Sequence, residues 1–322
     1  MKNLIGNLLL LSISLSVVFA VGEIASRYVT PISPGPSILD MEGNKQKISY
    51  IEAGETFRIT TPDFDAVTTI TKDGYRAPEA IGKPTDIFIG DSFTYAQGVT
   101  DDEAFPALYC KTRGLSCANL AVPGASTLYE IDRLESFIKT KKWSPKMVHL
   151  FFFTGNDFSD NIGAASKRKQ GLPYEPVELN SKTASIEEDL GPIKNLIALG
   201  LKHSNLLRVA YYKILPMIRD NPDELRETFN QALEITKQEF DRLDKLSKEY
   251  AFNYKIYILH PEPEITHNLY QEIDEKLQAL TQKPMVLLGD LFKKDTKDYF
   301  FPSDGHFNVA GNKKLAHFLL KN

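Results

Sequence analysis

The stretch DIFIGDSFTYAQGV, residues 86–99, begins as an apolar run and breaks off at a glycine, an aspartate and a serine. A short apolar run that ends at such residues is typical of a strand buried on both faces. Four more runs of this kind follow, and segments with helical start signals separate them. This alternation predicts an α/β three-layer sandwich with an open, mainly parallel five-stranded sheet. The five runs are DIFIG, CANLA, MVHLFFF, KIYIL and MVLLG.

Polar residues follow the ends of these runs, which is where ligands bind in open parallel sheets. Because the carboxyl ends of parallel strands meet at one edge, we expect four segments of the chain to converge there. They are Asp91 and Ser92 after the first run, Gly124 in a PGAS loop after the second, Asn156 and Asp157 after the third, and DGH at 304–306 after the last.

In the order GDS, PGAS, GND and DGH, these segments resemble the four sequence blocks of the SGNH or GDSL hydrolase family. The resemblance extends from about residue 85 to the C-terminus and implies an SGNH or flavodoxin-like fold with serine ester hydrolase activity. The segment ITKDGYRAPE, residues 70–79, also resembles membrane-anchored envelope members that modify polysaccharides. The expected substrate is therefore an acylated, especially O-acetylated, cell-surface glycan, and the reaction is hydrolysis or acetyl transfer.

The resemblance assigns a role to each residue of the site. Ser92 would be the nucleophile and His306 its base, since a serine hydroxyl is a poor nucleophile at neutral pH. Asp304 would orient the imidazole, although many family members place the acid three rather than two positions before the histidine. The N–H groups of Ser92 and Gly124 and the side-chain amide of Asn156 would form the oxyanion hole.

Each of these residues also has a purely structural explanation. Ser92 could cap the next helix, and Gly124 could serve a tight turn. Asn156 could belong to an Asx turn. We favour the catalytic interpretation because all four segments follow predicted strands in the order of the family. The candidate pocket residues near this edge are Asp91, Asp157 and His260.

The N-terminal segment has a positive charge at Lys2 and then about 18 residues without a charge. This length lies between a signal peptide and a short membrane span, and either would export the chain. We favour an uncleaved inner-membrane anchor at residues 1–27 with the hydrolase domain outside the cytoplasm; secretion after cleavage at Ala20 is the alternative. In an oxidising compartment Cys110 and Cys117 are a candidate disulfide.

The remaining chain divides into two expected regions. Residues 28–84 begin with several prolines and continue with FRITT and VTTIT, which predicts a linker and a small β extension. Residues 85–322 hold the hydrolase-like domain. Its helical insertion at about 158–220 could be a lid, a membrane-facing element or a helix packed on the core. Thr127 and Glu130 have the spacing of a capping box at a helix start.

Composition excludes several classes of protein. A net charge of −4 and only short basic runs argue against nucleic acid as a partner. The cysteines and histidines lack metal-site spacing, so we expect no metal and no cofactor. Two other functions remain open, a lipase or thioesterase and a non-catalytic glycan-binding component with an unidentified envelope-assembly partner.

Overall fold

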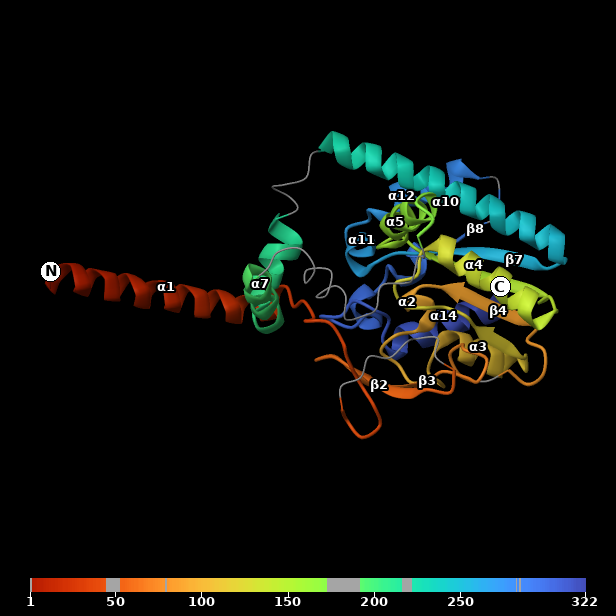
Figure 1. Cartoon of the computed structure of the whole chain (residues 1–322), viewed down its shortest axis with the longest axis horizontal. Helices are drawn as coiled ribbons and strands as arrows, with labels where there is room; N and C mark the ends of the chain where they lie inside the picture. The colour runs from red at the N-terminus through yellow and green to blue at the C-terminus, as the bar shows by residue number, and fades with distance from the viewer. Residues whose placement is uncertain are drawn as a thin grey trace. The chain divides into compact units, whose positions relative to one another are not determined.

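The computed structural model describes residues 2–44, 53–78, 80–172, 192–215, 222–281, 283 and 285–322. Two stretches of the predicted insertion, 173–191 and 216–221, lie outside the described residues. The chain divides into two compact units, and each is described by itself (Figure 1). One unit comprises Met1–Gly35 with Ser181–Asn221, and the other comprises Pro36–Asn180 with Pro222–Asn322.

The second unit is built on a five-stranded sheet in the order β5-β4-β6-β7-β8, and every pairing is parallel. The predicted fold class is therefore confirmed. The five apolar runs of the sequence supply the five strands, which are β4 (Asp86–Gly90), β5 (Cys117–Asn119), β6 (Met147–Phe153), β7 (Asn253–Leu259) and β8 (Met285–Leu287).

Buried apolar clusters lie on both faces of this sheet. Successive side chains of a strand point to opposite faces, so Ile87 and Ile89 join one cluster and Phe88 joins the other. The first cluster includes residues of α4 (Thr127–Lys141), α10 (Pro222–Tyr250) and α12 (Tyr270–Leu280). The second includes residues of α3 (Phe105–Arg113) and α14 (Val309–Lys321). The other helices of this unit are α2 (Ser92–Tyr95), α5 (Asp157–Lys169), α11 (Glu262–Thr266), α13 (Gly289–Phe292) and η2 (Thr296–Tyr299).

The first turn of α4 differs from the expected capping box. The N-cap is Ser126, whose hydroxyl accepts a hydrogen bond from the Tyr129 N–H at 3.3 Å. The helix therefore begins one residue too early for Thr127 to be the cap. Glu130 is consequently buried, at 2% exposure, instead of reaching back to the helix start.

A disulfide joins the end of α3 to the start of β5, and its two residues are Cys110 and Cys117. Between them the helix ends at Gly114, which adopts φ 64°. A residue in this left-handed conformation is a common helix terminator, and it allows the chain to turn back within a few residues.

A separate antiparallel sheet precedes the parallel one and consists of β1 (Ser37–Leu39), β2 (Thr56–Thr60) and β3 (Asp65–Thr69). This sheet is the predicted β extension. Its inward side chains, Phe57 and Ile59, share a buried cluster with Tyr95 and Ala121 of the α/β core. The extension thus completes the core of the second unit.

Arg76 connects this extension to the segment that follows β4. Its side chain is 1% exposed. The guanidinium donates to the carbonyl oxygens of Tyr95, of Ala96 at 2.6 Å and of Val99 at 2.6 Å. Its Nε also donates to Asp101 Oδ1 at 3.0 Å. One buried cation therefore satisfies three backbone acceptors directly after α2.

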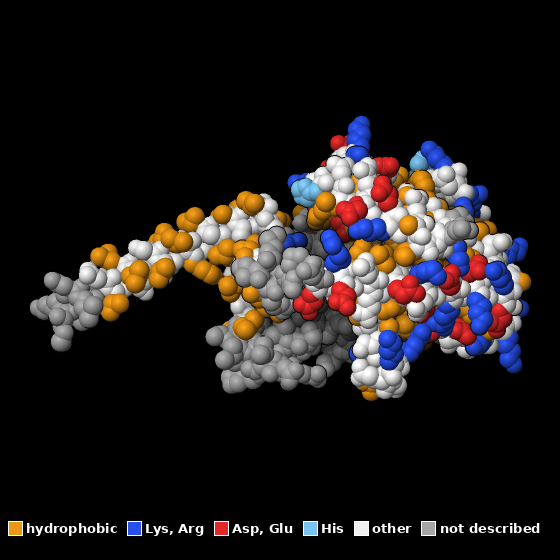
Figure 2. Space-filling model, turned by 90° about the horizontal axis from the view of Figure 1, so that it is seen from above, with side chains coloured by type: hydrophobic (Ala, Val, Ile, Leu, Met, Phe, Trp, Pro, Cys, Tyr) orange, Lys and Arg blue, Asp and Glu red, His pale blue; other side chains and the backbone are white. Residues whose placement is uncertain are grey.

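The first unit contains α1 (Lys2–Val29), α7 (Pro192–His203), α8 (Asn205–Val209) and the π-helical turn η1 (Ala210–Ile214). Within α1, Gly6–Val29 has a mean hydropathy of 2.3, and none of the span is buried. Figure 2 shows apolar side chains along the visible face of this helix. By length and composition α1 could cross a membrane, and a signal sequence would meet the same criteria.

We predict that Arg76→Lys lowers the free energy of unfolding by about 3 kcal/mol, because one ammonium cannot reach all the acceptors that the guanidinium satisfies. Urea denaturation measures the change. The matched control is Arg58→Lys, since Arg58 forms an exposed pair with Asp65, where we expect a loss below about 1 kcal/mol. Equal losses in the two variants would contradict this account of Arg76.

Candidate active site

Ser92 stands at the point where β4 ends and α2 begins. Its neighbour Asp91 caps this helix by accepting a hydrogen bond from the Phe93 N–H at 2.9 Å. The strand must turn sharply, and Gly90 permits it, since a Cβ there would lie 2.1 Å from Thr94 Oγ1. The geometry leaves Ser92 partly exposed while the residues on both sides of it are buried.

His306 lies between Ser92 and Asp304. Its Nε2 is 2.7 Å from Ser92 Oγ, and its Nδ1 is 2.5 Å from Asp304 Oδ1. With a proton on Nδ1 facing the carboxylate, Nε2 is free to accept the serine proton. The serine hydroxyl is also 3.4 Å from Asp91 Oδ2, a much longer contact. The arrangement can therefore activate Ser92 as a nucleophile.

The spacing of the acid follows from the backbone of Gly305, which has φ 86°. A residue in this left-handed region reverses the chain locally, and glycine adopts it without steric cost. The turn is closed by hydrogen bonds from Gly305 N to Phe301 O at 3.0 Å and from Phe301 N to His306 O at 2.8 Å. This turn brings Asp304 to its histidine across a separation of two residues.

Asp63 holds the same loop from the hairpin between β2 and β3. Its Oδ2 accepts hydrogen bonds from Ser303 N at 2.7 Å, Ser303 Oγ at 2.7 Å and Asp304 N at 2.8 Å. Phe64 packs beside Phe301, with ring centroids 4.9 Å apart. The β extension thus fixes the backbone of the residue that contacts His306, a role that the sequence did not reveal.

Gly124 and Asn156 follow β5 and β6, the two strands that flank β4. Gly124 has φ 73°, again a left-handed conformation. The Asn156 side chain donates from Nδ2 to Asp160 Oδ2 at 2.7 Å. Because an amide nitrogen carries two hydrogens, one remains for a ligand. Both residues therefore lie in loops that follow the strands beside β4, as the sequence predicts.

Three buried carboxyl groups interact electrostatically behind the serine. Burial raises the pKa of Asp91 to about 6. Burial also raises the pKa of Glu130 and of Asp157 well above their usual values, and the charge of Asp91 raises both further. Neither Glu130 oxygen has a hydrogen-bond partner among the described residues. Burial and the neighbouring carboxyl groups therefore favour the protonated forms of Glu130 and Asp157.

The candidate pocket residues lie beneath the surface. Asp91 and Asp157 are 0% exposed and His260 is 2% exposed. His260 Nε2 is 2.9 Å from Asp274 Oδ1, and its Nδ1 is 3.0 Å from Glu264 Oε2. Burial alone lowers the pKa of His260, but these two carboxylates outweigh it and raise that pKa. His260 therefore lies in the interior between two carboxylates, one at each ring nitrogen.

The described part of the chain contains no group of three or more histidine, cysteine, aspartate or glutamate residues placed to hold a metal ion. The groups that the structure brings together at the site are the hydroxyl of Ser92, the imidazole of His306 and the carboxylate of Asp304.

Comparisons with known proteins agree with this geometry. The sequence model of the family described as GDSL-like Lipase/Acylhydrolase matches residues 87–319, which is most of the chain. No curated protein sequence matches the chain.

Solved structures with a similar fold include two lipolytic proteins of the G-D-S-L family and an acetyl xylan esterase. The putative lipolytic protein from Desulfitobacterium hafniense DCB-2 is 10% identical, with a TM-score of 0.42, and the match covers 74% of this chain and 98% of that one. The one from Veillonella parvula DSM 2008 is 14% identical, with a TM-score of 0.38 and coverage of 73% and 96%. The acetyl xylan esterase from Geobacillus stearothermophilus is 12% identical, with a TM-score of 0.38 and coverage of 76% and 95%. At these identities the likeness concerns the fold alone.

We predict that Asp63→Ala lowers kcat for a short ester such as p-nitrophenyl acetate by about 10- to 100-fold, the effect of losing hydrogen bonds to a charged acceptor. The KM should change little, because Asp63 positions the Asp304 loop and does not face the substrate. Asp65→Ala in the same hairpin is the control, since the exposed Asp65 carboxylate pairs with Arg58 of the neighbouring strand. An unchanged kcat in Asp63→Ala would refute the positioning role.

A second prediction concerns stability against pH. Because burial raises the pKa of Glu130 above its usual 4.5, the folded protein binds a proton that the unfolded chain has lost. Glu130 therefore contributes to the free energy of unfolding a share that is fully present below about pH 4.5 and is lost as pH rises above that value. Glu130→Gln removes this proton uptake, so the difference in stability between variant and wild type should shift in favour of the variant from pH 4.5 to 8. Chemical denaturation across this range measures it, and parallel curves would show that Glu130 is not held protonated.

Proposed function

Since the chain belongs to the GDSL-like lipase/acylhydrolase family, we propose that it is an exported serine esterase or acyltransferase that acts through an acyl-Ser92 intermediate. The observation that carries the proposal is the position of His306, within hydrogen-bonding distance of both Ser92 Oγ and Asp304 Oδ1. A serine that only capped a helix would have no need of an aligned base. The substrate class proposed is an O-acyl ester, in particular an O-acetyl ester on a cell-surface glycan.

The reaction follows from these contacts. Ser92 Oγ attacks the ester carbonyl carbon while its proton passes to His306 Nε2, and the carbonyl oxygen becomes an oxyanion. Asp304 stabilises the imidazolium that forms. Collapse of the tetrahedral intermediate breaks the bond to the leaving oxygen, which takes the proton from His306. Water or a sugar hydroxyl then attacks the acyl-serine by the same steps in reverse order, which gives hydrolysis or transfer.

The oxyanion would be held by three donors, the N–H groups of Ser92 and Gly124 and the free amide hydrogen of Asn156. The strand order supports this assignment, because Gly124 and Asn156 belong to the loops that follow β5 and β6, the neighbours of β4. Asp160 fixes the amide through its contact with Nδ2. Preorganised donors of this kind lower the barrier because they need no reorientation during the reaction.

Two features support the exported location. The disulfide between Cys110 and Cys117 is of a kind that persists in oxidising compartments. The apolar helix α1 supplies a membrane anchor or a signal sequence. We favour the anchor, because the helix continues unbroken past Ala20 to Val29 and its last turns hydrogen-bond Ser204 and Asn205. Intact-mass analysis of the protein from membranes distinguishes a retained anchor from cleavage.

The glycan and acetyl parts of the proposal derive from the resemblance of residues 70–79 to envelope members that modify polysaccharides. A lipase or thioesterase would use the same three residues on longer acyl chains. A glycan-binding or assembly component would not need them. Rates on a series of esters separate these functions, because an acetyl-specific site loses activity sharply beyond short chains and a lipase gains it.

We predict that a fluorophosphonate adds once to the wild-type protein, at Ser92, and that Ser92→Ala and His306→Ala lose or greatly slow this labelling. The hydrolysis of p-nitrophenyl acetate should fall in both variants by about 1,000-fold or more, as when other catalytic triads are disrupted. Thr94→Ala is the control, since Thr94 lies in the same helix and its hydroxyl has no hydrogen-bond partner among the described residues. If a folded wild-type protein showed no adduct, the binding-component function would replace the esterase.

A further inference from the structure

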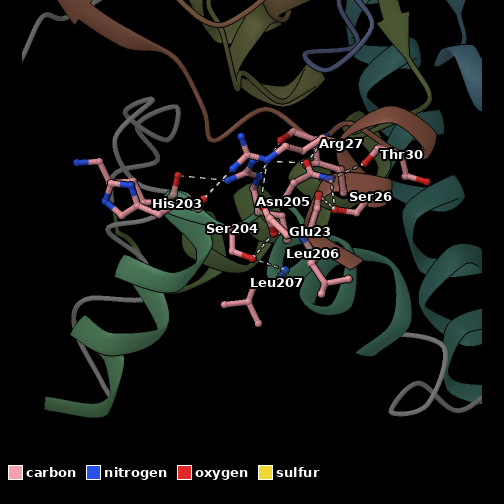
Figure 3. Close-up of polar contacts among 12 residues, drawn as sticks. Glu23, Ser26, Arg27, Thr30, His203, Ser204, Asn205, Leu206 and Leu207 are labelled. Atoms are coloured by element: carbon pink, nitrogen blue, oxygen red, sulfur yellow. Dashed lines mark hydrogen bonds and ion pairs between the residues drawn. The ribbon is translucent and has the colours of Figure 1, made fainter. Parts of the chain in front are cut away.

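The carboxylate of Glu23, near the end of α1, binds the start of α8. Its Oε1 accepts from Asn205 N at 2.9 Å, and its Oε2 accepts from Leu206 N at 3.0 Å and from Ser204 Oγ at 2.7 Å (Figure 3). Arg27, one turn further along α1, donates to Oε1 at 2.8 Å. The first amides of a helix have no partner within it, and here a side chain from a distant helix satisfies them.

The adjoining contacts fix the position of α8 further. Asn205 donates to Ser26 Oγ at 3.1 Å and to Thr30 O at 3.0 Å, and its Oδ1 accepts from Ile32 N at 2.8 Å. Arg208 donates to Ile32 O at 2.7 Å. Asn205 and Arg208 are buried, at 2% and 8% exposure. The start of α8 is therefore held by α1 on one side and, on the other, by the segment that follows α1 and includes Ile32.

The continuous helical segment 205–215 has two distinct faces. Leu206 packs against α1, because a Cβ on Gly22 would lie 3.1 Å from its Cδ2. Four other apolar side chains follow at helical spacing and are 36% to 49% exposed. We call them the apolar stripe, and they are Leu207, Tyr211, Ile214 and Leu215. A stripe with this spacing is the pattern of an amphipathic helix that lies on an apolar surface.

The position along α1 at which the apolar stripe is held indicates which apolar surface the stripe contacts. Glu23 is six residues before Val29, which is about 9 Å along a helix. A bilayer core about 30 Å thick takes roughly 20 residues, and the charge-free run Asn3–Gly22, which lies between Lys2 and Glu23, has about that length. Glu23 and the turns that follow it therefore lie at the membrane interface. Tyr211 and Tyr212 are of the residue type that collects at this level.

Basic side chains in and near this segment are suited to the same membrane interface. Lys202, at the end of α7, and Lys213, in η1, are both exposed. Long basic side chains can extend from an apolar face to lipid phosphates. The apolar span of α1 has no buried residue, and the stripe belongs to a helical segment that is hydrogen-bonded to this helix. A bilayer is therefore the partner that both surfaces share.

We propose that residues 205–215 form a second membrane contact, an interfacial helix whose apolar stripe enters the headgroup region of the bilayer that α1 spans, and that Glu23 holds it there. This rests on the anchored location in the proposed function. The chain would then be attached by one spanning helix and one helix lying in the plane of the interface. The partner is a phospholipid surface rather than another protein.

The experiment uses the full chain in vesicles of phosphatidylethanolamine and phosphatidylglycerol. A photoreactive benzoylphenylalanine replaces one residue at a time, at Tyr211 in the stripe, at Leu15 in α1 and at Leu269 in the other unit. Leu269 is the matched control, because it is 57% exposed and apolar. After illumination, mass spectrometry measures lipid adducts, and fluorophosphonate labelling of Ser92 is measured on the same vesicles.

The proposal expects lipid adducts at Tyr211 with a yield comparable to Leu15 and well above Leu269. Adducts at Leu15 without adducts at Tyr211 would overturn it while leaving the anchor intact. Equal yields at Tyr211 and Leu269 would also overturn it, since any exposed apolar residue would then react. An absence at both Leu15 and Tyr211 would overturn the anchor and the inference together, and Ser92 labelling reports independently on the esterase.

Glu23→Gln tests the role of the carboxylate. Loss of a charged acceptor should speed hydrogen exchange at the Asn205 and Leu206 amides by about tenfold or more, and adducts at Tyr211 should fall while those at Leu15 remain. Arg27→Gln is the control, because the Arg27 side chain is 59% exposed and its pair contributes little. Unchanged exchange, or unchanged adducts at Tyr211, would show that Glu23 does not hold the contact.

Discussion

Strand β4 has a parallel neighbour on each side and apolar clusters over both faces, so the chain that leaves it has few directions available. Every residue of the strand is buried. The strands beside it, β5 and β6, are followed by the loops that contain Gly124 and Asn156. The hydrogen bonding of one central strand therefore determines which strands and loops are its neighbours, and Ser92 lies at its carboxyl end, the edge at which open parallel sheets bind ligands.

The final component of the site is not part of the sheet. The loop of Asp304 and His306 precedes α14, and its shape depends on the conformation of Gly305 and on the carboxylate of Asp63. A small antiparallel sheet thus supports a loop from the other end of the chain. Arg76, which follows this sheet in the chain, donates to carbonyl oxygens at the end of α2 and in the turn after it. The segments that carry Ser92 and Asp304 are thus both held by residues that precede the sequence blocks of the family.

The sequence could predict the sheet and the order of its loops because these follow from local patterns. Apolar runs bounded by glycine identify the strands, and residues at their ends must share an edge. Asp63 could not be predicted, since it contacts residues 240 positions away and stands in an ordinary turn motif. Glu130 was misassigned for a related reason. Its spacing from Thr127 fits a capping box, but the N-cap is Ser126 and the Glu130 side chain is buried, so tertiary packing overrides the local signal. The contact between the insertion and α1 could not be predicted either, because no sequence pattern relates Glu23 to Asn205.

The long separation between Glu23 and its partners has a consequence for biosynthesis. The amides that this carboxylate binds belong to residues made 182 and 183 positions later. At ordinary rates of translation the ribosome needs roughly 10 to 40 s to add that length of chain. During this interval the Glu23 carboxylate must have other hydrogen-bond partners, such as water, lipid headgroups or a folding factor. The helix that is synthesised first therefore reaches its final set of contacts only after most of the parallel sheet has been translated.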